Sequence, residues 1–414
     1  MRGLVGERLS YSLSPQVYNL LAGIRDYQLL EVDETGLKSL LECRDFESLN
    51  VTIPYKKTVM AFCDELSERA KAIGSVNTII NQKGHLYGDN TDAAGFVWLL
   101  SLYHIDVQNK TAAVLGSGGA ALAISYALRQ AGAKEVRLVS RTPTQGQLSY
   151  SDLISYPASL LINATPVGNH PNLKDSPLDL SVYPQIETVI DIIYNPLRTS
   201  LLMQAKDLGK QTAGGLAMLV GQGVEALLDF GVRKLKNQPE TVLNTLVKQM
   251  TNIVLIGMPD SGKTTIGQAL AKCLNREFAD VDTLIEKQEK KSIVEIFKES
   301  GEEGFRKKER NVIAALAARQ SLIIATGGGS ILDDGNVRLL KQNGWLVYLQ
   351  RPLSDLAVSA ERPLAQNKTQ LEILYQKRAH LYQKAADYVC ENLVIEHTLA
   401  QIQEAYNDKN NLGS

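Results

Sequence analysis

The residues best suited to chemistry form a glycine-rich stretch, Gly257 to Thr264, with the sequence GMPDSGKT. It matches the phosphate-binding pattern G-x-x-x-x-G-K-[ST] and lies between a strand-like run, NIVLIG, and a segment with helical spacing. Backbone N–H groups of such a loop surround phosphate oxygens, while Lys263 can reach the β- and γ-phosphates and the Thr264 hydroxyl can ligate Mg²⁺. The sequence therefore predicts a nucleoside triphosphate site formed by Gly257, Asp260, Ser261, Gly262, Lys263, Thr264 and Thr265.

Two carboxylates, Asp280 and Asp282, follow this loop in the segment EFADVDTLIEKQ. Because they alternate at the end of a predicted strand, we expect both to face the same side. Carboxylates beside a phosphate-binding loop hold Mg²⁺ and orient the attacking group. The candidate metal-binding residues are therefore Thr264, Asp280 and Asp282.

A second glycine-rich turn contains Gly116, Gly118 and Ala121 at G-x-G-x-x-A spacing. It follows a buried strand and opens a helix, and a second strand comes after it, as is typical of a dinucleotide-binding domain. That second strand ends without the Asp or Glu of an NAD site, and Arg141 suits a 2′-phosphate, so NADP is favoured. The predicted cofactor-binding residues are Gly116, Ser117, Gly118, Gly119, Ala120, Ala121, Ser140, Arg141 and Thr142.

Four short polar segments precede this turn, and they read SLSP, NVTIPYK, SVNT and GDNTD. Ser12 and Ser14 stand two apart at a helix mouth, where both hydroxyls can point at one anion. Lys56 stands at a strand-to-helix corner, and Asp92 lies in a polar turn before a helix. Taken singly, such residues are most often helix caps or solvated side chains. The four segments together are far more specific.

Together these segments resemble the substrate domain of shikimate dehydrogenases, whose pattern runs S-x-S-P, N-V-T-x-P-x-K, A-x-N-T and G-x-N-T-D. The resemblance continues to about residue 250 through NATPVG and DIIYNPLRTS, with small departures at Tyr11, Tyr18 and Ser75. It implies that Lys56, oriented by Asp92, stabilises and protonates the oxygen formed when hydride reduces a ketone. It also implies substrate contacts from Ser12, Ser14, Thr52, Lys56, Asn77, Asp92, Tyr194 and Gln222, with Asn163 and Thr165 near the cofactor.

Residues 252–395 resemble shikimate kinases in the phosphate loop, D-x-D, G-F-R, T-G-G-G, R-P-L and R-x-x-x-Y. The resemblance implies that Arg306 and Arg378 bind the carboxylate of shikimate and that Asp282 holds the attacking hydroxyl. It places Gly328 and Gly329 beside the substrate and Arg362, in a lid, beside the transferring phosphoryl group. The segment between Arg362 and Arg378 looks short for the family's lid.

These motifs need three α/β units to position them. We predict a substrate-binding domain at 1–95, a Rossmann NADP-binding domain at 96–250 with helices that return to the first domain, and a P-loop kinase domain with a parallel sheet at 251–414. No Gly/Ser-rich or Pro-rich spacer separates the last two, so the tether is expected to be short and stiff.

The composition is that of a soluble globular chain of 414 residues, with 44% hydrophobic and 21% charged residues. A net charge of −1 gives no reason to expect nucleic acid or an anionic membrane as a partner. The sequence has no apolar run of about 18 residues and no signal peptide, and its four cysteines are scattered, so a cytoplasmic location is expected. The sequence leaves open whether the chain forms a homo-oligomer.

The resemblances together predict a bifunctional enzyme of aromatic amino acid biosynthesis. It would reduce 3-dehydroshikimate with NADPH and phosphorylate the resulting shikimate with Mg-ATP to shikimate 3-phosphate. Two alternatives stay open: a catalytically inactive sensor of these metabolites, and an NAD-dependent enzyme that oxidises quinate or shikimate. The second alternative is supported by the segment Pro143–Gln145, which has no charged residue. The family usually carries another basic residue there, beyond Arg141.

Overall fold

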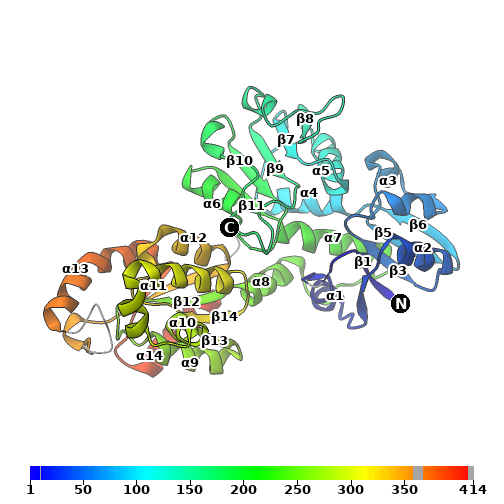
Figure 1. Cartoon of the computed structure of the whole chain (residues 1–414). Coiled ribbons are helices and arrows are strands. Elements are labelled where there is room, and N and C mark those ends of the chain that lie inside the picture. The colour runs from blue at the N-terminus through cyan, green and yellow to red at the C-terminus, as the bar shows by residue number, and fades with distance from the viewer. Residues whose placement is uncertain (10, 358–366, 409–414) are drawn as a thin grey trace.

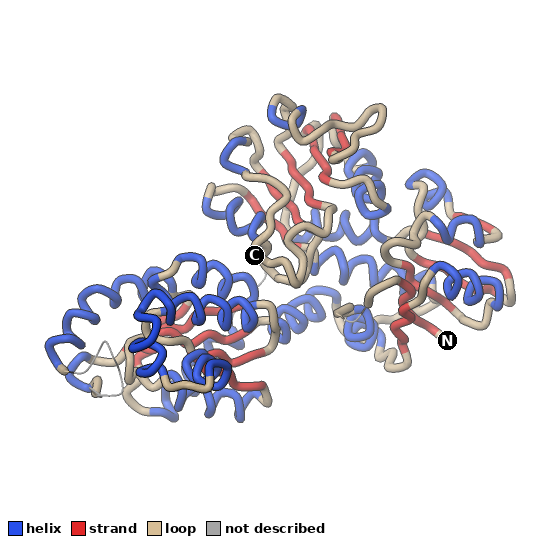
Figure 2. The backbone as a smooth tube through the Cα atoms, viewed as in Figure 1, coloured by secondary structure: helices blue, strands red, loops and turns tan. Residues whose placement is uncertain are grey.

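Three α/β units follow one another along the chain, each built on its own sheet (Figure 1). The computed structural model describes residues 1–9, 11–357 and 367–408. The predicted fold class is confirmed: two sheets are parallel throughout, and helices cover them (Figure 2). Figure 1 shows the third unit on the opposite side of the second unit from the N-terminal one.

The first sheet is mixed, with six strands in the order β2-β1-β3-β5-β6-β4. β1 runs parallel to β2 and β3, whereas β5 runs antiparallel to β3 and β6. The elements of this unit are β1 (Arg2–Gly6), α1 (Ser14–Ala22), β2 (Tyr27–Glu31), α2 (Glu34–Cys43), β3 (Ser48–Val51), the 3₁₀-helix η1 (Thr58–Phe62), β4 (Glu65–Leu66), α3 (Glu68–Ile73), β5 (Thr78–Gln82) and β6 (His85–Asp89).

The second sheet has five parallel strands in the order β11-β10-β9-β7-β8. Its strands are short, and every residue of β9 and β10 is buried, as expected where helices cover both faces. The elements are β7 (Thr111–Leu115), α5 (Gly119–Gln130), β8 (Glu135–Val139), η2 (Asp152–Ile154), β9 (Leu160–Asn163), η3 (Leu180–Val182), β10 (Thr188–Asp191), α6 (Ser200–Asp207) and β11 (Gln211–Gly214).

Three long helices join the units: α4 (Asp92–Leu102), α7 (Leu216–Asp229) and α8 (Pro239–Met250). α4 and α7 pack at very short range, because a Cβ at Gly95 would lie 2.6 Å from the backbone nitrogen of Gln222. One continuous apolar core runs from the first unit through α8 into the third sheet. The predicted boundary at 95/96 falls inside α4, and the one at 250/251 falls between α8 and the next strand.

The third sheet has five parallel strands in the order β13-β14-β12-β15-β16. All five residues of β12 are buried, and a separate apolar core covers the second face of this sheet. The elements are β12 (Asn252–Ile256), α9 (Lys263–Leu274), β13 (Glu277–Asp280), α10 (Val281–Glu289), α11 (Ile293–Ala317), β14 (Leu322–Ala325), η4 (Ser330–Leu332), α12 (Asp334–Asn343), β15 (Gly344–Gln350), η5 (Leu353–Asp355), α13 (Lys368–Ala385), β16 (Tyr388–Glu391) and α14 (Ile395–Asp408).

One local expectation was wrong. Asp280 and Asp282 do not alternate along a strand: β13 ends at Asp280, whose side chain caps α10 by accepting from the Thr283 N–H, so Asp282 lies in the first helical turn. Arg306 lies in α11, which a capping box begins at Ser292 and which Gly301 interrupts with a positive φ of 66°, so Arg306 lies close to the start of the second helical segment.

Candidate active sites

The phosphate-binding loop lies where the sequence predicts it, at the carboxyl end of β12 and the start of α9. Gly262 caps α9 with a φ of 87°, a conformation that favours glycine. The Lys263 ammonium group donates to the carbonyl oxygens of Gly257 at 3.0 Å and Met258 at 2.7 Å, which folds its side chain over the loop. The helix N-terminus and this cation make the loop suitable for phosphate.

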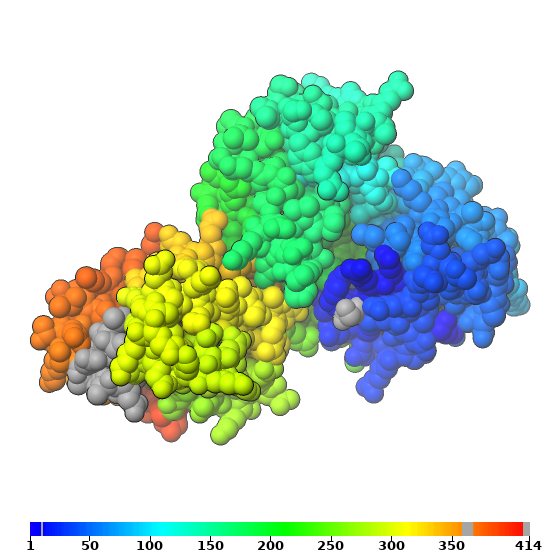
Figure 3. Space-filling view, viewed as in Figure 1, coloured from blue at the N-terminus to red at the C-terminus, as the bar shows by residue number. Residues whose placement is uncertain are grey.

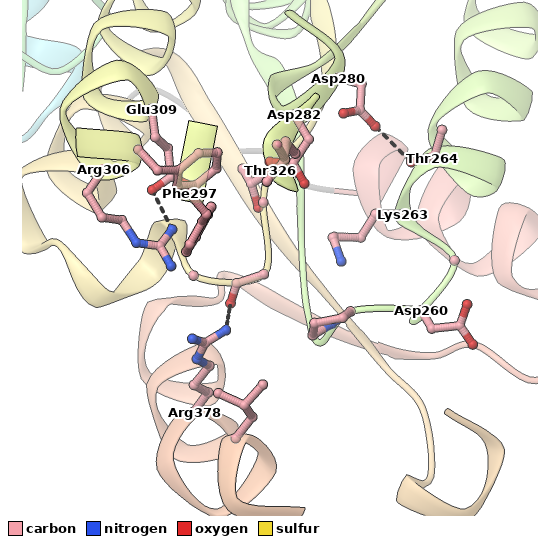
Figure 4. A pocket seen from close by; sticks show the side chains of 18 of the residues that line it. Asp260, Lys263, Thr264, Asp280, Asp282, Phe297, Arg306, Glu309, Thr326 and Arg378 are labelled. Carbon is pink, nitrogen blue, oxygen red and sulfur yellow. Dashed lines mark hydrogen bonds and ion pairs between the residues drawn. The ribbon is translucent and has the colours of Figure 1, made fainter. Parts of the chain in front are cut away.

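A cavity of about 330 Å³ opens beside this loop (Figure 4). Asp260, Gly262, Lys263, Thr264 and Thr265 line it; Gly257 and Ser261, which were also predicted, do not. Further predicted residues come from other elements to the same cavity: Asp280, Asp282, Arg306, Gly328, Gly329 and Arg378. Arg362 lies outside the described residues.

Oxygen atoms suited to a magnesium ion meet at one side of the cavity. The Thr264 hydroxyl donates to Asp280 at 2.7 Å. Oδ1 of Asp282 is buried and has no hydrogen-bond partner within the described part of the chain. Burial raises the pKa of Asp282 to about 6, and the neighbouring carboxylates Asp280 and Glu309 add to this shift. These hydroxyl and carboxylate oxygens are suited to bind Mg²⁺, which prefers oxygen ligands.

Two guanidinium groups face the glycine turn after β14 from different helices (Figure 4). Arg306 donates to Glu309 at 2.7 Å, and Arg378 donates to the Gly328 carbonyl at 3.1 Å. A Cβ at Gly329 would overlap the Arg306 guanidinium, so this approach depends on glycine. Burial lowers the pKa of Arg378, and the charge of Arg306 lowers it further. Two such cations in one cavity are suited to a carboxylate.

In the N-terminal half, the centre of the site is an ion pair. Lys56 Nζ lies 2.6 Å from Asp92 Oδ2, with side-chain exposures of 14% and 3%. The second oxygen of Asp92 accepts from Asn77 Nδ2 at 2.8 Å, and the same amide group donates to Gln222 at 3.2 Å. The network joins the residue before β5, the helices α4 and α7, and the corner that follows β3, so four parts of the chain fix the direction of the Lys56 ammonium group.

A cavity of about 390 Å³ lies on one side of Lys56. The Ser12 hydroxyl donates to Ser14 at 3.2 Å at the start of α1, which brings the two serines together as predicted. Burial raises the pKa of Tyr194 to about 12, so this phenol stays neutral near pH 7. All the residues predicted for the substrate line this cavity except Asp92: Ser12, Ser14, Thr52, Lys56, Asn77, Tyr194 and Gln222.

A larger cleft of about 1540 Å³ lies on the other side of Lys56 and reaches the second sheet. Gly116 has a φ of 109°, which requires a glycine at the turn after β7. Asn163 and Ala121 are fully buried and do not line the cleft; Asn163 accepts from the Thr165 hydroxyl at 2.7 Å and so holds it in place. The predicted residues on its wall are Thr52, Lys56, Asp92, Gly116, Ser117, Gly118, Gly119, Ala120, Ser140, Arg141, Thr142, Thr165, Tyr194 and Gln222.

Known proteins match the N-terminal half and the C-terminal part of the chain separately. A shikimate dehydrogenase (NADP(+)) of Clostridium beijerinckii is 39% identical over 242 residues, which cover 54% of this chain and 89% of that protein. The sequence model of the shikimate dehydrogenase substrate binding domain matches residues 4–79. The chain belongs to the shikimate dehydrogenase family. Its C-terminal part carries a second domain, because the shikimate kinase model matches residues 259–405.

Solved structures agree with this membership for the dehydrogenase half. Shikimate dehydrogenase 1 from Peptoclostridium difficile has a TM-score of 0.55 and 34% identity, and the match covers 59% of this chain and 97% of that one. The dehydrogenase from Thermus thermophilus, solved with NADP(H) and shikimate, has a TM-score of 0.53 and 32% identity over 58% of this chain and 96% of that one. The predicted pairing of a dehydrogenase with a kinase is confirmed.

Several residues at these sites were missed by reasoning from the sequence. Glu309 is fully buried and bonds both Arg306 and the Ser330 hydroxyl, at 2.7 and 2.6 Å. Its position three residues after Arg306 on a helix could have suggested it. Tyr150, on the wall of the cofactor cleft, and Tyr382, which donates to the Gly328 carbonyl, had no local signal.

The described residues contain no cluster of three or more His, Cys, Asp or Glu side chains that could hold a metal ion. Across the same residues, no helix is both long and apolar enough to cross a membrane.

Proposed function

We propose that this chain reduces 3-dehydroshikimate to shikimate with NADPH and then phosphorylates shikimate with ATP to shikimate 3-phosphate. The observation that carries the proposal is the buried Lys56–Asp92 pair, which stands between the substrate-sized cavity and the larger cofactor cleft. The phosphate loop, with its own carboxylates and guanidinium groups, supplies the second half. In this reading, the hydroxyl made at the first site is available for phosphorylation at the second.

In the reduction, bound NADPH supplies the hydride. Ser12 and Ser14 donate to the substrate carboxylate at the mouth of α1. Lys56 holds a proton beside the ketone oxygen and gives it to the alkoxide as that oxygen gains charge. Asp92 keeps the ammonium group directed at that position, and Arg141 at the far end of the cleft would receive the 2′-phosphate of NADP.

In the phosphorylation, Arg306 and Arg378 bind the carboxylate of shikimate and orient its ring. Asp282 orients the attacking hydroxyl and accepts its proton, which a carboxylate with a pKa near 6 can do at neutral pH. Thr264 and Asp280 would hold Mg²⁺, and Lys263 would move from its carbonyl partners to the phosphates of ATP. Gly328 and Gly329 leave room for the substrate beside both arginines.

The same proposal includes a cytoplasmic location and small-molecule substrates alone as partners, without nucleic acid or membrane. A catalytically inactive sensor is the competing function, and it would require loss of catalytic groups. Lys56, Asp92, Lys263, Asp280 and Asp282 are all present at the two cavities.

One incubation tests the proposal. The chain is mixed with 3-dehydroshikimate, NADPH and Mg-ATP while NADPH absorbance is followed and products are separated by mass. We expect NADPH consumption and shikimate 3-phosphate. Lys56→Ala should lower the rate of NADPH consumption by about 10²-fold or more and leave phosphorylation of added shikimate intact. Lys263→Ala should abolish phosphorylation and leave NADPH consumption intact. A parent protein that binds both metabolites but converts neither would support the sensor and overturn the proposal.

A further inference from the structure

The kinase domain covers one side of the dehydrogenase half, at two loops that also form the wall of the dehydrogenase cleft. The first loop, 166–177, lines the cleft with Pro166, Val167, Ser176 and Pro177. The second, 191–199, carries Tyr194 into both dehydrogenase cavities. In the space-filling view the surface of the second unit, in green, meets that of the kinase, in yellow to orange (Figure 3).

The second loop is held at its base by its own half and at its tip by the kinase. Asp191 is fully buried, burial raises its pKa to about 6, and it accepts from Thr199 at 2.7 Å, which closes the base. At the tip, the Leu197 N–H donates to Oδ1 of Asn343 at 2.9 Å. The Arg198 N–H donates to the carbonyl oxygen of the neighbouring kinase residue, Gln342, at 3.0 Å.

The Arg198 side chain adds a second contact with the kinase. Its Nη2 donates to the carbonyl oxygen of Gly344, the first residue of β15, at 2.7 Å. Burial in this interface lowers the pKa of the guanidinium. Asn343 is itself fully buried and donates to the Ala317 carbonyl at 3.2 Å, which fixes the acceptor that meets the loop.

The first loop is clamped by apolar contact as well as hydrogen bonds. Leu173 is 4% exposed and packs in a small apolar cluster with Ala317 and Leu339 of the kinase. Its carbonyl oxygen accepts from the Gln342 side chain at 2.7 Å and from the Ser200 hydroxyl at 2.8 Å. The two loops are also tied together, because the His170 N–H donates to the Asn195 carbonyl at 2.9 Å.

We infer that the kinase domain is a structural part of the dehydrogenase site: Gln342 and Asn343 are positioning residues that hold the two cleft loops and thereby place Tyr194 against the substrate. A loop fixed at both ends presents its side chain in one position, and small displacements of a positioning residue cost binding and rate. The inference rests on the proposed reduction of 3-dehydroshikimate.

The test uses the full-length chain with kinase-side substitutions. Asn343→Ala removes the acceptor of the Leu197 N–H and leaves a buried donor unpaired. We expect it to raise the KM for 3-dehydroshikimate on the order of tenfold, while the kinase KM for ATP stays within about twofold of the parent value. Gln342→Leu, which keeps the side-chain size, should act in the same direction through Leu173. Arg338→Ala is the matched control on the same helix, because its exposed ion pair with Asp207 is worth little.

Hydrogen exchange supplies a readout that does not depend on turnover. The Leu197 and Arg198 amides should be protected in the parent protein and exchange faster in Asn343→Ala. If Asn343→Ala fails to fold, Arg198→Ala with Arg198→Lys as the conservative partner tests the same contact from the dehydrogenase side; the lysine variant should retain most of the affinity. Unchanged KM and unchanged exchange in Asn343→Ala and Gln342→Leu would overturn the inference. A parent protein that does not reduce 3-dehydroshikimate would instead overturn the proposed function.

Discussion

Asp92→Asn tests the centre of the dehydrogenase site with the smallest change in shape. The carboxylate of Asp92 serves two donors at once, Lys56 at 2.6 Å and Asn77 at 2.8 Å. An amide has one acceptor oxygen, so one of these donors would face an N–H group instead. The lost contact is charge-assisted and buried, and such bonds are worth roughly 1.5–3 kcal/mol, or about 10- to 150-fold in rate if the cost falls on the transition state.

The assay compares the two activities of one protein sample. Asp92→Asn should lower kcat for NADPH-dependent reduction by the factor above and change the KM for NADPH little, because Arg141 and the Gly116 turn are untouched. Phosphorylation of added shikimate should proceed at the parent rate, which also shows that the variant is folded. Loss of both activities in a well-folded protein would mean that the halves share a site or a conformational step. Reduction at the parent rate would refute the role of the Lys56–Asp92 pair.

Four further outcomes are expected. The parent protein should prefer NADPH to NADH, and Arg141→Ala should erode that preference; equal kcat/KM with both cofactors in the parent would contradict the 2′-phosphate assignment. Arg306→Ala should raise the kinase KM for shikimate by about 10- to 150-fold and that for ATP little, whereas the opposite pattern would assign Arg306 to the nucleotide. The kinase rate should fall about tenfold per pH unit below roughly 6, because Asp282, whose pKa is raised to about 6, is protonated there; a profile that is flat from pH 5 to 8 would exclude Asp282 as the proton acceptor. Unlabelled shikimate added to a reaction with labelled 3-dehydroshikimate should dilute the label in shikimate 3-phosphate in proportion, and undiluted label would demonstrate direct transfer.

Local motifs could be predicted from the sequence because their chemistry depends on neighbours along the chain. The loop from Gly257 to Thr264 is of this kind, since its glycines, its lysine and the helix start are contiguous. The prediction that Asp282 lies at the end of a strand was wrong, because β13 ends at Asp280 and α10 begins at the next residue. A boundary shifted by one or two residues decides whether a carboxylate lies on a strand or in a helix, and such boundaries are hard to predict from sequence. The buried partner Glu309 depends on how α11 packs, which spacing alone leaves open.

The contacts between the halves could not be predicted, because they join residues far apart in sequence. Leu197 and Asn343 are separated by 146 positions, and neither has a residue type that marks an interface. The chain after α8 was expected to act as a short, stiff tether. The two halves are also held together by an interface, formed by the continuous core through α8 and by the hydrogen bonds at loop 191–199.

Strand polarity explains why free exchange of shikimate is expected in spite of this interface. The kinase contacts the dehydrogenase through residues at the amino ends of its strands, such as Gln320 before β14 and Gly344 at the start of β15. The residues proposed to act on phosphate and magnesium follow the carboxyl ends of β12, β13 and β14. Since the sheet is parallel, these two edges are separated by the length of a strand, roughly 13–17 Å for the four or five residues of β12, β13 and β14. We therefore expect the kinase cavity to open on the side away from the dehydrogenase, and we expect shikimate formed beside Lys56 to reach Arg306 through solvent.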